Sequence, residues 1–477
     1  MSANLLAKLR RMDREEIRFR AKAALRTRVR RAQSRLKPPV WNRSRLPLSA
    51  QAVPPSVKEA LGRREWHAAH HALGHHFAHR HCVFPLDPRR ISRLAARIRE
   101  AFPLLDPTSR ADRIVEGRYD LLGYCDVHAG SPPDWHRDPV HGRRAPLKFW
   151  NAIPYLDPRY GDHKITWELN RHQHFLALGR AYALTGDRRY YETFVLHLTD
   201  WIRANPPLLG PNWASMLELA FRCLSWIWAL HFFAAAASDR DKHPWTVDLL
   251  LALDRQLGHV EENLSRYFSP NTHLTGEALG LYVAGRCLPE LERAATRARL
   301  GREVLLNEVE PQVLADGGHA ELSTHYHRYS TDFYLLAFNV ARLSGDPEAH
   351  RFKDAALRQA RYLRAITDDR GRIPLIGDDD GGQLFPICGR RPWDCADTLA
   401  TAAVLLDEPS LATGPVPEET YWLCGGVEIG DLADVPSRYH SANLAASGYC
   451  VSRNAKGDHL VFDCGRHGYL NGGHAHA

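Results

Sequence analysis

Three short segments of the chain carry side chains that can exchange protons near neutral pH or bind a metal. Residues 271–277 are NTHLTGE, residues 321–329 are ELSTHYHRY and residues 473–476 are GHAH. Imidazole and phenol groups serve in general acid–base catalysis, and imidazoles also bind metals. His474 and His476 alternate along a predicted strand, so both side chains point to one face. The three segments are therefore candidates for a catalytic or metal site.

The first two segments also have a structural interpretation. Asn271 is a favoured residue for a helix N-cap. Tyr326 fits a half-buried aromatic residue whose hydroxyl has a partner. His325 and His327, on either side of it, could contact a ligand or cap a turn. Local sequence leaves these alternatives open.

Helical periodicity from about residue 60 to 405 predicts the elements that position the first two segments. The apolar stretches at helical spacing are 167–184, 190–204, 214–237, 247–267 and 331–343. Two similar tetrapeptides, LTGD at 184–187 and LSGD at 343–346, each end one such helix and begin another, because Gly suits a left-handed cap and Asp an N-cap. Stacked helical hairpins of this kind form a solenoid or a closed toroid.

Strand-like patterns follow after about residue 415. The runs YWLC at 421–424, GYCV at 448–451 and HLVF at 459–462 are separated by Gly and Asn/Asp turns. We therefore expect a multidomain chain, α then β: an incomplete (α/α) toroid of helical hairpins, followed by the first strands of an antiparallel β-sandwich. The predicted divisions are a basic helical arm with a proline-rich linker at 1–58, the toroid at 59–410 and a truncated β-domain at 411–477.

The net positive charge of the chain comes from its first 37 residues. They hold 13 Lys/Arg and 3 Asp/Glu, which leaves 50 of the 63 basic and 52 of the 55 acidic side chains to the remainder. A basic arm can make weak contact with an anionic membrane surface or with nucleic acid, or stay solvated with one face on the body. The high pI therefore belongs to the arm and not to the body, which is close to neutral; the solvated interpretation is preferred, and no nucleic-acid partner is expected.

The sequence favours a cytoplasmic location. Lys8, Arg10 and Arg11 interrupt the early apolar run, so no secretory signal is predicted. The apolar stretch 224–237 is too short to span a bilayer and predicts a buried helix, so we expect no transmembrane segment. Nine scattered cysteines without a CxxC pair argue against a disulfide framework.

Taken together, the three segments resemble the heparinase II/III-like family of polysaccharide lyases. The patterns N-x-H-x-x-x-E, E-x-S-x-x-Y-H-x-Y and G-H-x-H occur in this order; Tyr326 lies 55 positions after Asn271, and His474 lies 148 positions after Tyr326. The segments WELNR at 167–171 and NWASMLELAFR at 212–222 also match. The resemblance covers roughly residues 100–477 of the chain.

The resemblance implies β-elimination on a uronic-acid-containing polysaccharide, with such an acidic polysaccharide as the partner. The sugar carboxylate must be neutralised before a base can remove the C5 proton, and an acid must protonate the departing oxygen. By resemblance, Asn271 neutralises the carboxylate, Tyr326 donates the proton and can also act as base on one epimer, and His474 is the base on the other epimer.

The resemblance also implies substrate-binding positions in the toroid. These are Trp213, Glu218, Arg222, His273, Glu277, Glu321, His325 and His327. Glu218 and Arg222 are four residues apart on a predicted helix, so a structural ion pair is the alternative.

A metal is implied only in the β-domain. His476 matches a metal-ligand position, which implies a structural divalent metal, Zn or Ca, in the complete domain and none required for the chemistry. Because the chain stops at Ala477, we expect this site and His474 to be poorly held and lyase activity to be low. The DDDGG run at 378–382 lacks the remaining spacing of an EF-hand and predicts a turn.

Two other functions stay open. One is a non-catalytic protein that binds acidic polysaccharides. The other is a toroid glycoside hydrolase with paired carboxylates such as Glu277 and Asp378. The Asn–Tyr–His set favours the lyase, because hydrolysis requires two carboxylates and no tyrosine acid. The better-known family members act outside the cytoplasm, so a periplasmic location is the alternative to a cytoplasmic one.

Overall fold

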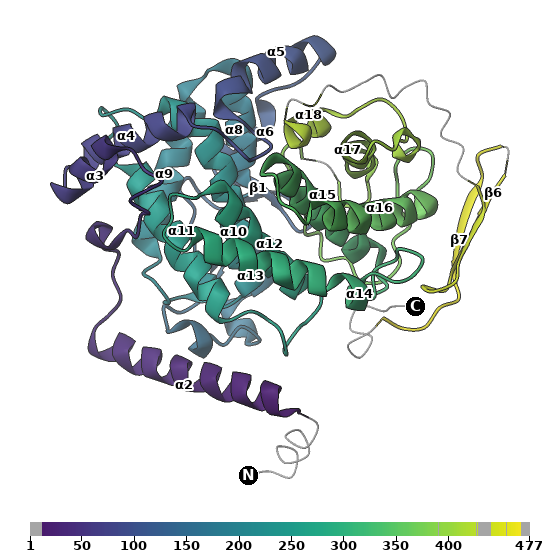
Figure 1. Ribbon diagram of the computed structural model, residues 1–477, viewed down its shortest axis with the longest axis horizontal. Helices are drawn as coiled ribbons and strands as arrows, with labels where there is room; N and C mark the ends of the chain where they lie inside the picture. Colours follow the sequence, from purple (N-terminus) through teal and green to yellow (C-terminus); the bar gives the residue numbers. More distant parts are fainter. Residues whose placement is uncertain (1–11, 390, 426, 428–439, 455, 469–477) are drawn as a thin grey trace.

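Most of the protein is built from consecutive helical hairpins (Figure 1). A computed structural model describes residues 12–468 except 390, 426, 428–439 and 455. The hairpin helices are α8 (His174–Thr185), α9 (Arg188–Ala204), α10 (Met216–Phe233), α11 (Trp245–Glu262), α12 (Thr272–Cys287), α13 (Ala294–Asn307), α15 (Thr324–Leu343), α16 (Ala349–Ile366), α17 (Ala396–Leu406) and α18 (Glu418–Cys424).

The contacts between these helices form the predicted toroid. Each first helix of a hairpin packs on its second, and α8, α10, α12, α15 and α17 form a row in which each contacts the next. Helix α5 (Ile91–Ala101) contacts both α8 and α18, so it connects the first hairpin to the last. A helical toroid followed by antiparallel strands is therefore the fold, as the sequence predicted.

The other helical elements surround the hairpins. The remaining α-helices are α2 (Arg14–Leu36), α3 (Pro55–Gly62), α4 (Trp66–His79), α6 (Ser109–Val115), α7 (His163–Asn170) and α14 (Val309–Gln312). Single 3₁₀ turns are η1 (Arg43–Arg45), η2 (Pro88–Arg90), η3 (Trp150–Ala152), η4 (Pro158–Tyr160), η5 (Pro211–Trp213), η6 (Ala234–Ala236) and η7 (Pro409–Leu411).

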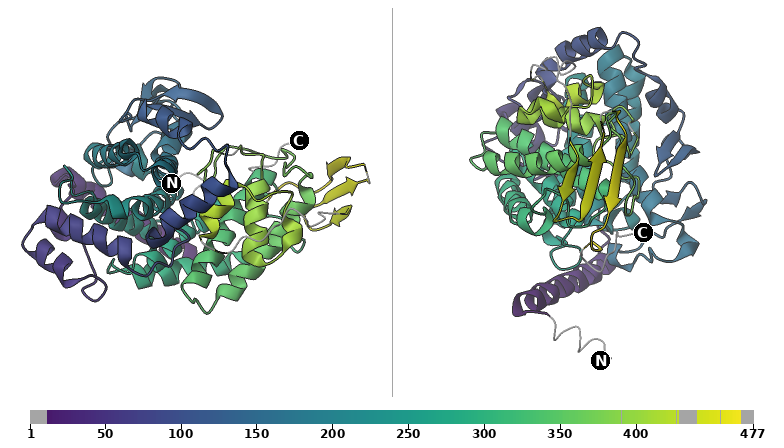
Figure 2. Two further views of the ribbon diagram at one scale, coloured as in Figure 1. Left: turned by 90° about the horizontal axis from the view of Figure 1, so that it is seen from above. Right: turned by 90° about the vertical axis from the view of Figure 1, so that its right-hand side faces the viewer.

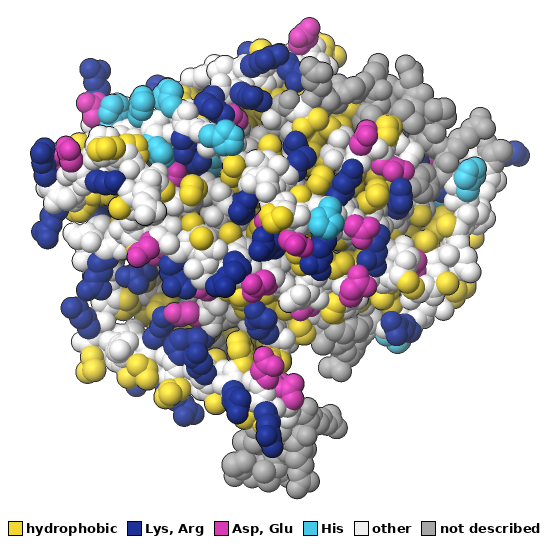
Figure 3. All heavy atoms as spheres, viewed as in Figure 1, with side chains coloured by type: hydrophobic (Ala, Val, Ile, Leu, Met, Phe, Trp, Pro, Cys, Tyr) yellow, Lys and Arg dark blue, Asp and Glu magenta, His cyan; other side chains and the backbone are white. Residues whose placement is uncertain are grey.

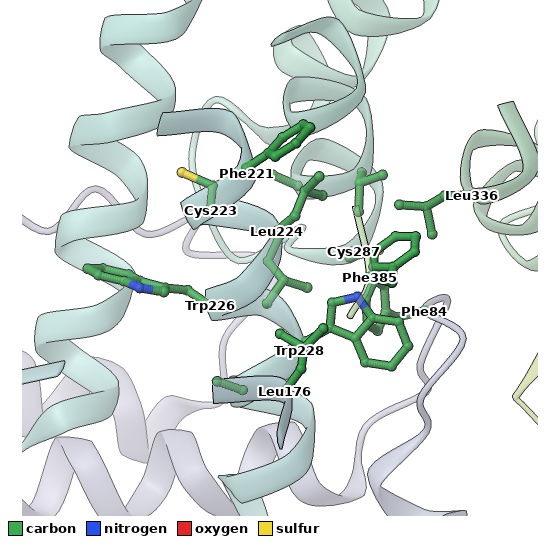
Figure 4. Packing of buried hydrophobic residues seen from close by; sticks show 14 of the residues in the cluster. Phe84, Leu176, Phe221, Cys223, Leu224, Trp226, Trp228, Cys287, Leu336 and Phe385 are labelled. Atoms are coloured by element: carbon green, nitrogen blue, oxygen red, sulfur yellow. The ribbon is translucent and has the colours of Figure 1, made fainter. Parts of the chain in front are cut away.

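Helix α10 is the centre of the hydrophobic core. Every one of its residues is buried, and Figure 4 shows Phe221, Leu224, Trp226 and Trp228 projecting from it into packed surroundings. The stretch Met216–Ala236 is long and apolar enough to cross a membrane, but 89% of its apolar window is buried inside the protein. It is therefore a core helix, as predicted for the second half of this stretch.

The C-terminal strands form one antiparallel sheet beside the helices (Figure 2). Its order is β5 (Ala442–Leu444), β6 (Tyr449–Arg453) and β7 (His459–Asp463). It is attached to the helical part by polar contacts: the hydroxyl of Tyr362 on α16 donates to Ser447 Oγ (3.1 Å), and Ser447 donates its N–H (2.7 Å) and its hydroxyl (2.9 Å) to the carboxylate of Asp316.

Some predicted elements were wrong. The YWLC run at 421–424 is not a strand but the end of α18, which Pro417 precedes and Gly425 closes in the left-handed conformation. The predicted helix 167–184 is divided between α7 and α8, because His172 between them has a φ of 56°. Two antiparallel hairpins were not predicted: β1 (Arg118–Leu121) with β2 (Tyr124–His128), and β3 (Arg137–Asp138) with β4 (Arg143–Arg144).

The tetrapeptide at 184–187 acts as predicted, whereas at 343–346 Ser344 is the C-cap of α15 and Glu348, not Asp346, is the N-cap of α16. Gly186 ends α8 with a φ of 76°, and the Asp187 side chain accepts the N–H of Arg189 to begin α9. Gly345 has a φ of 61°, and Asp346 accepts the N–H of Glu348 just before α16 (3.0 Å).

Helix α2 of the basic arm lies along the outside of the body. None of its 23 residues is buried, and Figure 3 shows Lys and Arg side chains gathered along it and over the neighbouring face. Arg20 donates to the carbonyl of Tyr267 (2.5 Å), and Arg26 and Arg30 contact Glu262. The arm is therefore attached to the end of α11 through arginines.

Candidate active site

The start of α15 places Tyr326 among carboxylates. The hydroxyl of the N-cap residue Ser323 accepts the N–H of Tyr326 (3.3 Å) and donates to the carbonyl of Asp378 (2.7 Å). Tyr326 is 7% exposed. Burial, and then the charges of three carboxylates (Asp380, Asp378 and Glu321), raise its pKa above the ordinary value. Its phenol therefore stays protonated at neutral pH, which suits a proton donor.

Asn271 lies just before the neighbouring helix, α12. Its side-chain oxygen accepts the N–H of His273 (3.0 Å), which confirms the predicted N-cap. The next residue, Thr272, donates its N–H (3.0 Å) and its hydroxyl (3.1 Å) to the carboxylate of Glu321. Because Glu321 also raises the pKa of Tyr326, it brings the starts of α12 and α15 into one region. The amide nitrogen of Asn271 is a hydrogen-bond donor, which is the kind of group that would stabilise the carboxylate of a bound sugar.

The turn that carries Glu321 is strained and is covered by the C-terminal part. Leu322 has a φ of 52°, a conformation that a leucine rarely adopts. Its carbonyl accepts the hydroxyl of Tyr449 on β6 (3.1 Å). Gly468 lies directly against Glu321, since an added Cβ there would be 2.1 Å from the Glu321 carbonyl oxygen. The chain after β7 therefore contacts the turn of Glu321 at Gly468, which precedes His474 by six positions in the sequence.

His325 faces two aspartates of the DDDGG turn. Its Nδ1 is 3.1 Å from Asp379 Oδ1, and its Nε2 is 3.6 Å from Asp380 Oδ1. The two carboxylates also accept the N–H groups of Gly381 (2.7 Å) and Gly382 (3.0 Å), which is the turn predicted from the sequence.

Asp380 stays ionised in this position. Burial opposes its ionisation, but the neighbouring His325 ring and the charge of Arg171 hold the pKa of Asp380 well below its usual range. A negative charge therefore persists beside Tyr326.

Arg171 joins two further carboxylates behind this turn. It donates to both oxygens of Glu218 (2.5 and 3.0 Å) and lies 2.7 Å from Glu168. Its guanidinium also stacks 5.0 Å over the ring of Phe221. Burial raises the pKa of Glu168 to about 7, even though Arg171 lowers it. Glu218 thus pairs with Arg171, and not with Arg222 four residues away.

Three predicted substrate-binding residues belong to the packed core instead. Trp213, Arg222 and Glu277 have no exposed surface. The guanidinium of Arg222 stacks 4.5 Å over the ring of Trp201. The carboxylate of Glu277 accepts the N–H (2.8 Å) and the hydroxyl (2.6 Å) of Ser265. This corrects the prediction, because these three side chains stabilise the toroid and present no surface to a sugar.

His327 and His273 differ in their surroundings. Nε2 of His327 is 3.0 Å from the carbonyl of Gln359, and its ring packs on Tyr362, both on α16. Burial lowers the pKa of His327 to about 4, so the ring is neutral at pH 7. His327 therefore belongs to the α15–α16 contact, whereas His273 is half-buried beside Asn271.

Comparison with known proteins assigns the family. The family model Heparinase II/III N-terminus matches residues 49–354, more than half of the chain. The chain belongs to the heparinase II/III family. It is 27% identical over 240 residues to the heparin-sulfate lyase of Bacteroides stercoris, covering 46% of this chain and 33% of that one. It is 30% identical over 171 residues to the heparin-sulfate lyase of Bacteroides thetaiotaomicron, covering 35% and 24%.

A solved structure agrees with the fold. The crystal structure of heparinase III aligns with a TM-score of 0.59 at 18% identity, covering 90% of this chain and 62% of that one. This chain thus spans a quarter to a third of the curated lyases in sequence, and about three fifths of that solved chain. At this identity, the likeness to the solved structure shows the fold alone.

Two predicted residues of this family member lie outside the described residues. These are His474, the predicted base, and His476, the predicted metal ligand. Their roles stay predictions.

Other residues of the site were missed in the sequence. Arg171 lies in the WELNR segment that matches the family, and Asp380 lies in the DDDGG turn. Neither segment predicted that these two residues would lie near Tyr326. Two surface hollows lie elsewhere on the protein. One of about 590 Å³ lies between Trp41 and α9, one of about 440 Å³ lies between α12 and α13, and none of the candidate catalytic residues lines either.

Proposed function

We propose that this chain acts as a polysaccharide lyase that cleaves a uronic-acid-containing polysaccharide by β-elimination. The observation that supports it is the position of Asn271 and Tyr326 on two sides of Glu321, with Asn271 as the N-cap of α12 and Tyr326 in the first turn of α15. Family membership and the heparin-sulfate lyase relatives support the same reaction class.

The proposed reaction begins with the sugar carboxylate. The amide of Asn271 donates to it, and the positive end of the α12 dipole adds to the stabilisation. On one epimer His474 removes the C5 proton; on the other, Tyr326 acts from its ionised form, takes the C5 proton and passes that same proton to the leaving oxygen. The electron pair of the broken C5–H bond forms the C4=C5 double bond, the C4–O bond breaks, and the phenol of Tyr326 gives its proton to the leaving oxygen.

The surroundings of Tyr326 support the donor role. The ionised carboxylate of Asp380 favours the neutral phenol, so Tyr326 holds its proton until a more basic oxygen develops in the transition state. The His325 ring lies beside the same carboxylate, with its Nε2 3.6 Å from Asp380 Oδ1.

The partner and the location are also proposals. We propose an acidic polysaccharide or oligosaccharide as substrate and weak membrane-surface contact for the basic arm. The cytoplasmic location predicted from the sequence and the periplasmic one implied by the family are separated by cell fractionation. A structural metal at His476 likewise stays a prediction.

The glycoside hydrolase alternative requires two accessible carboxylates, and one of the two proposed residues, Glu277, is not accessible. Glu277 is buried and hydrogen-bonded to Ser265, and burial raises its pKa to about 8. It offers no surface to a glycosidic bond, so a pair with Asp378 is not formed.

The test is the ultraviolet absorbance of the unsaturated uronate after incubation with glucuronan, alginate and glycosaminoglycans. A lyase creates this chromophore, a hydrolase creates reducing ends without it, and a binding protein creates neither. Asn271→Asp separates the structural and catalytic roles of Asn271. Aspartate is an equally good N-cap, so stability should hold, while its charge repels the sugar carboxylate and should lower activity at least about 100-fold. Full activity of Asn271→Asp would contradict the proposed role.

A further inference from the structure

We infer that His325, Asp379 and Asp380 form a binding site for a divalent cation. One ligand atom from each side chain lies within 4.8 Å of the other two. His325 Nδ1 lies 3.1 Å from Asp379 Oδ1, which is close to the separation of two ligands of one metal at about 2.1 Å, whereas the 3.6 Å contact with Asp380 is made by the other ring nitrogen, Nε2. A metal bound through one of the two nitrogens would draw in both carboxylates, since one ligand atom of each already lies within 4.8 Å of that nitrogen.

The state of His325 is an independent observation. Its side chain is 2% exposed, and neither ring nitrogen makes a hydrogen bond of normal geometry, although both face the carboxylates. Buried polar atoms of this kind nearly always have a bonded partner. The hydroxyl of Tyr329, whose ring stacks on that of His325, is also buried without such a bond. A cation with its bound water supplies partners for these atoms.

The charge around the turn favours a cation. Asp378 precedes the two aspartates, and Glu168 and Glu218 lie behind them. The compensating positive charge is Arg171, but its hydrogen bonds go to Glu218, and it reaches Asp380 only through its field. An additional divalent charge reduces the repulsion among these carboxylates.

The ligand set indicates which ion binds. One imidazole and two carboxylates suit a first-row ion such as Mn²⁺ or Zn²⁺, and three protein ligands leave open positions for water or a substrate oxygen. This site is separate from the one predicted at His476. If the proposed lyase function holds, the cation reduces the negative charge of the turn beside Tyr326 and allows an anionic sugar to approach.

The test uses the full chain, stripped with a chelator and titrated with manganese chloride alone. Loss of the electron paramagnetic resonance signal of free Mn²⁺ measures binding without any polysaccharide. We expect one site per chain, weakened at least about tenfold in Asp379→Asn and in Asp380→Asn, because even outer-shell substitutions cost about 10–100-fold in metal affinity. Mn²⁺ should also raise the melting temperature of the unsubstituted chain and not that of these variants.

Two control variants identify the source of binding. Asp354→Asn removes an exposed acid on α16 and should bind Mn²⁺ unchanged. The double variant His474→Ala/His476→Ala should also keep the site. Loss of Mn²⁺ in this double variant with retention in Asp379→Asn would overturn the inference, as would no binding by the unsubstituted chain. Asp379 is the more exposed of the two aspartates, so its substitution should disturb the fold less. If Asp380→Asn does not fold, the loss of binding is therefore measured with Asp379→Asn alone. Binding without lyase activity would refute only the proposed function.

Discussion

The carboxylate of Glu321 receives two hydrogen bonds from Thr272, one from the backbone N–H (3.0 Å) and one from the hydroxyl (3.1 Å). This buried link connects the first turn of α12 to the turn that precedes α15. It also places a negative charge at the positive end of the α12 dipole, where such a charge is stabilising.

Glu321→Ala should destabilise the protein by about 2 kcal/mol, because it leaves a buried N–H without its charged acceptor. Lyase activity should fall as well, since Asn271 and Tyr326 would lose their common support. Urea unfolding measures the first effect. The control Glu310→Ala removes an acid whose side chain is 81% exposed and should change the stability by less than about 0.5 kcal/mol. Equal effects of the two substitutions would contradict the importance of this link.

Tyr326→Phe should lower lyase activity by about 10²–10⁴-fold, the range of a lost general acid. The ring stays in place, so the fold should persist by circular dichroism. A matched control lies on the same helix: Tyr334→Phe removes a hydroxyl that donates to the Leu305 carbonyl (2.9 Å). It should cost about 1 kcal/mol of stability with activity retained. If both variants lose activity alike, the effect is structural.

Because Glu277 holds a proton in the native state, the free energy of unfolding should decrease as pH rises. Burial raises its pKa to about 8, although hydrogen bonds from Ser265 lower it. Between the ordinary carboxyl pKa and about 8, the native state keeps a proton that the unfolded chain releases, so the free energy of unfolding decreases with pH by several kcal/mol. In Glu277→Gln this component should vanish. Urea unfolding at pH 5, 6, 7 and 8 checks it, and equal slopes for both proteins would refute the assignment.

Gly285→Ala should destabilise the contact between α12 and α13. An added Cβ would lie 2.4 Å from the backbone nitrogen of Ala298 and 2.5 Å from the carbonyl oxygen of Ala294, and neither backbone can move freely. We expect a loss of about 1–3 kcal/mol, as in other overpacked cores. At Gly62, the last residue of α3, an added Cβ meets nothing within 4 Å. Gly62→Ala should therefore leave the thermal midpoint unchanged or slightly raised.

The sequence was informative about elements with strong local signals. Apolar spacing predicted the long helices, and Gly186 and Asp187 marked a real boundary. The break between α7 and α8 at His172 was not predicted, because a left-handed backbone conformation at one histidine does not change the spacing of the apolar residues around it. Residues 421–424 were misassigned because a short apolar run fits a strand and a buried helix equally well, and packing on α17 decides between them.

The candidate site was only partly predictable. Motif spacing selected Asn271, Tyr326 and Glu321, which the fold brings together. The same motifs also included Trp213 and Arg222, since a motif does not separate residues that line a site from those that pack behind it. The pairs Arg171–Glu218 and His325–Asp380 join residues 47 and 55 positions apart. Only the toroid determines such contacts.

The attachment of the C-terminal sheet has a consequence for local opening. Ser447 and Tyr449 bond to Asp316 and Leu322, both in the loop that carries Glu321. Detaching the sheet would leave the Asp316 carboxylate and the Leu322 carbonyl without these partners, so the two segments should open as one cooperative unit. Amide hydrogen exchange should then give β6 and the 316–323 loop the same opening free energy, lower than that of α10. The precision of the site would depend on a small sheet that lies outside the toroid.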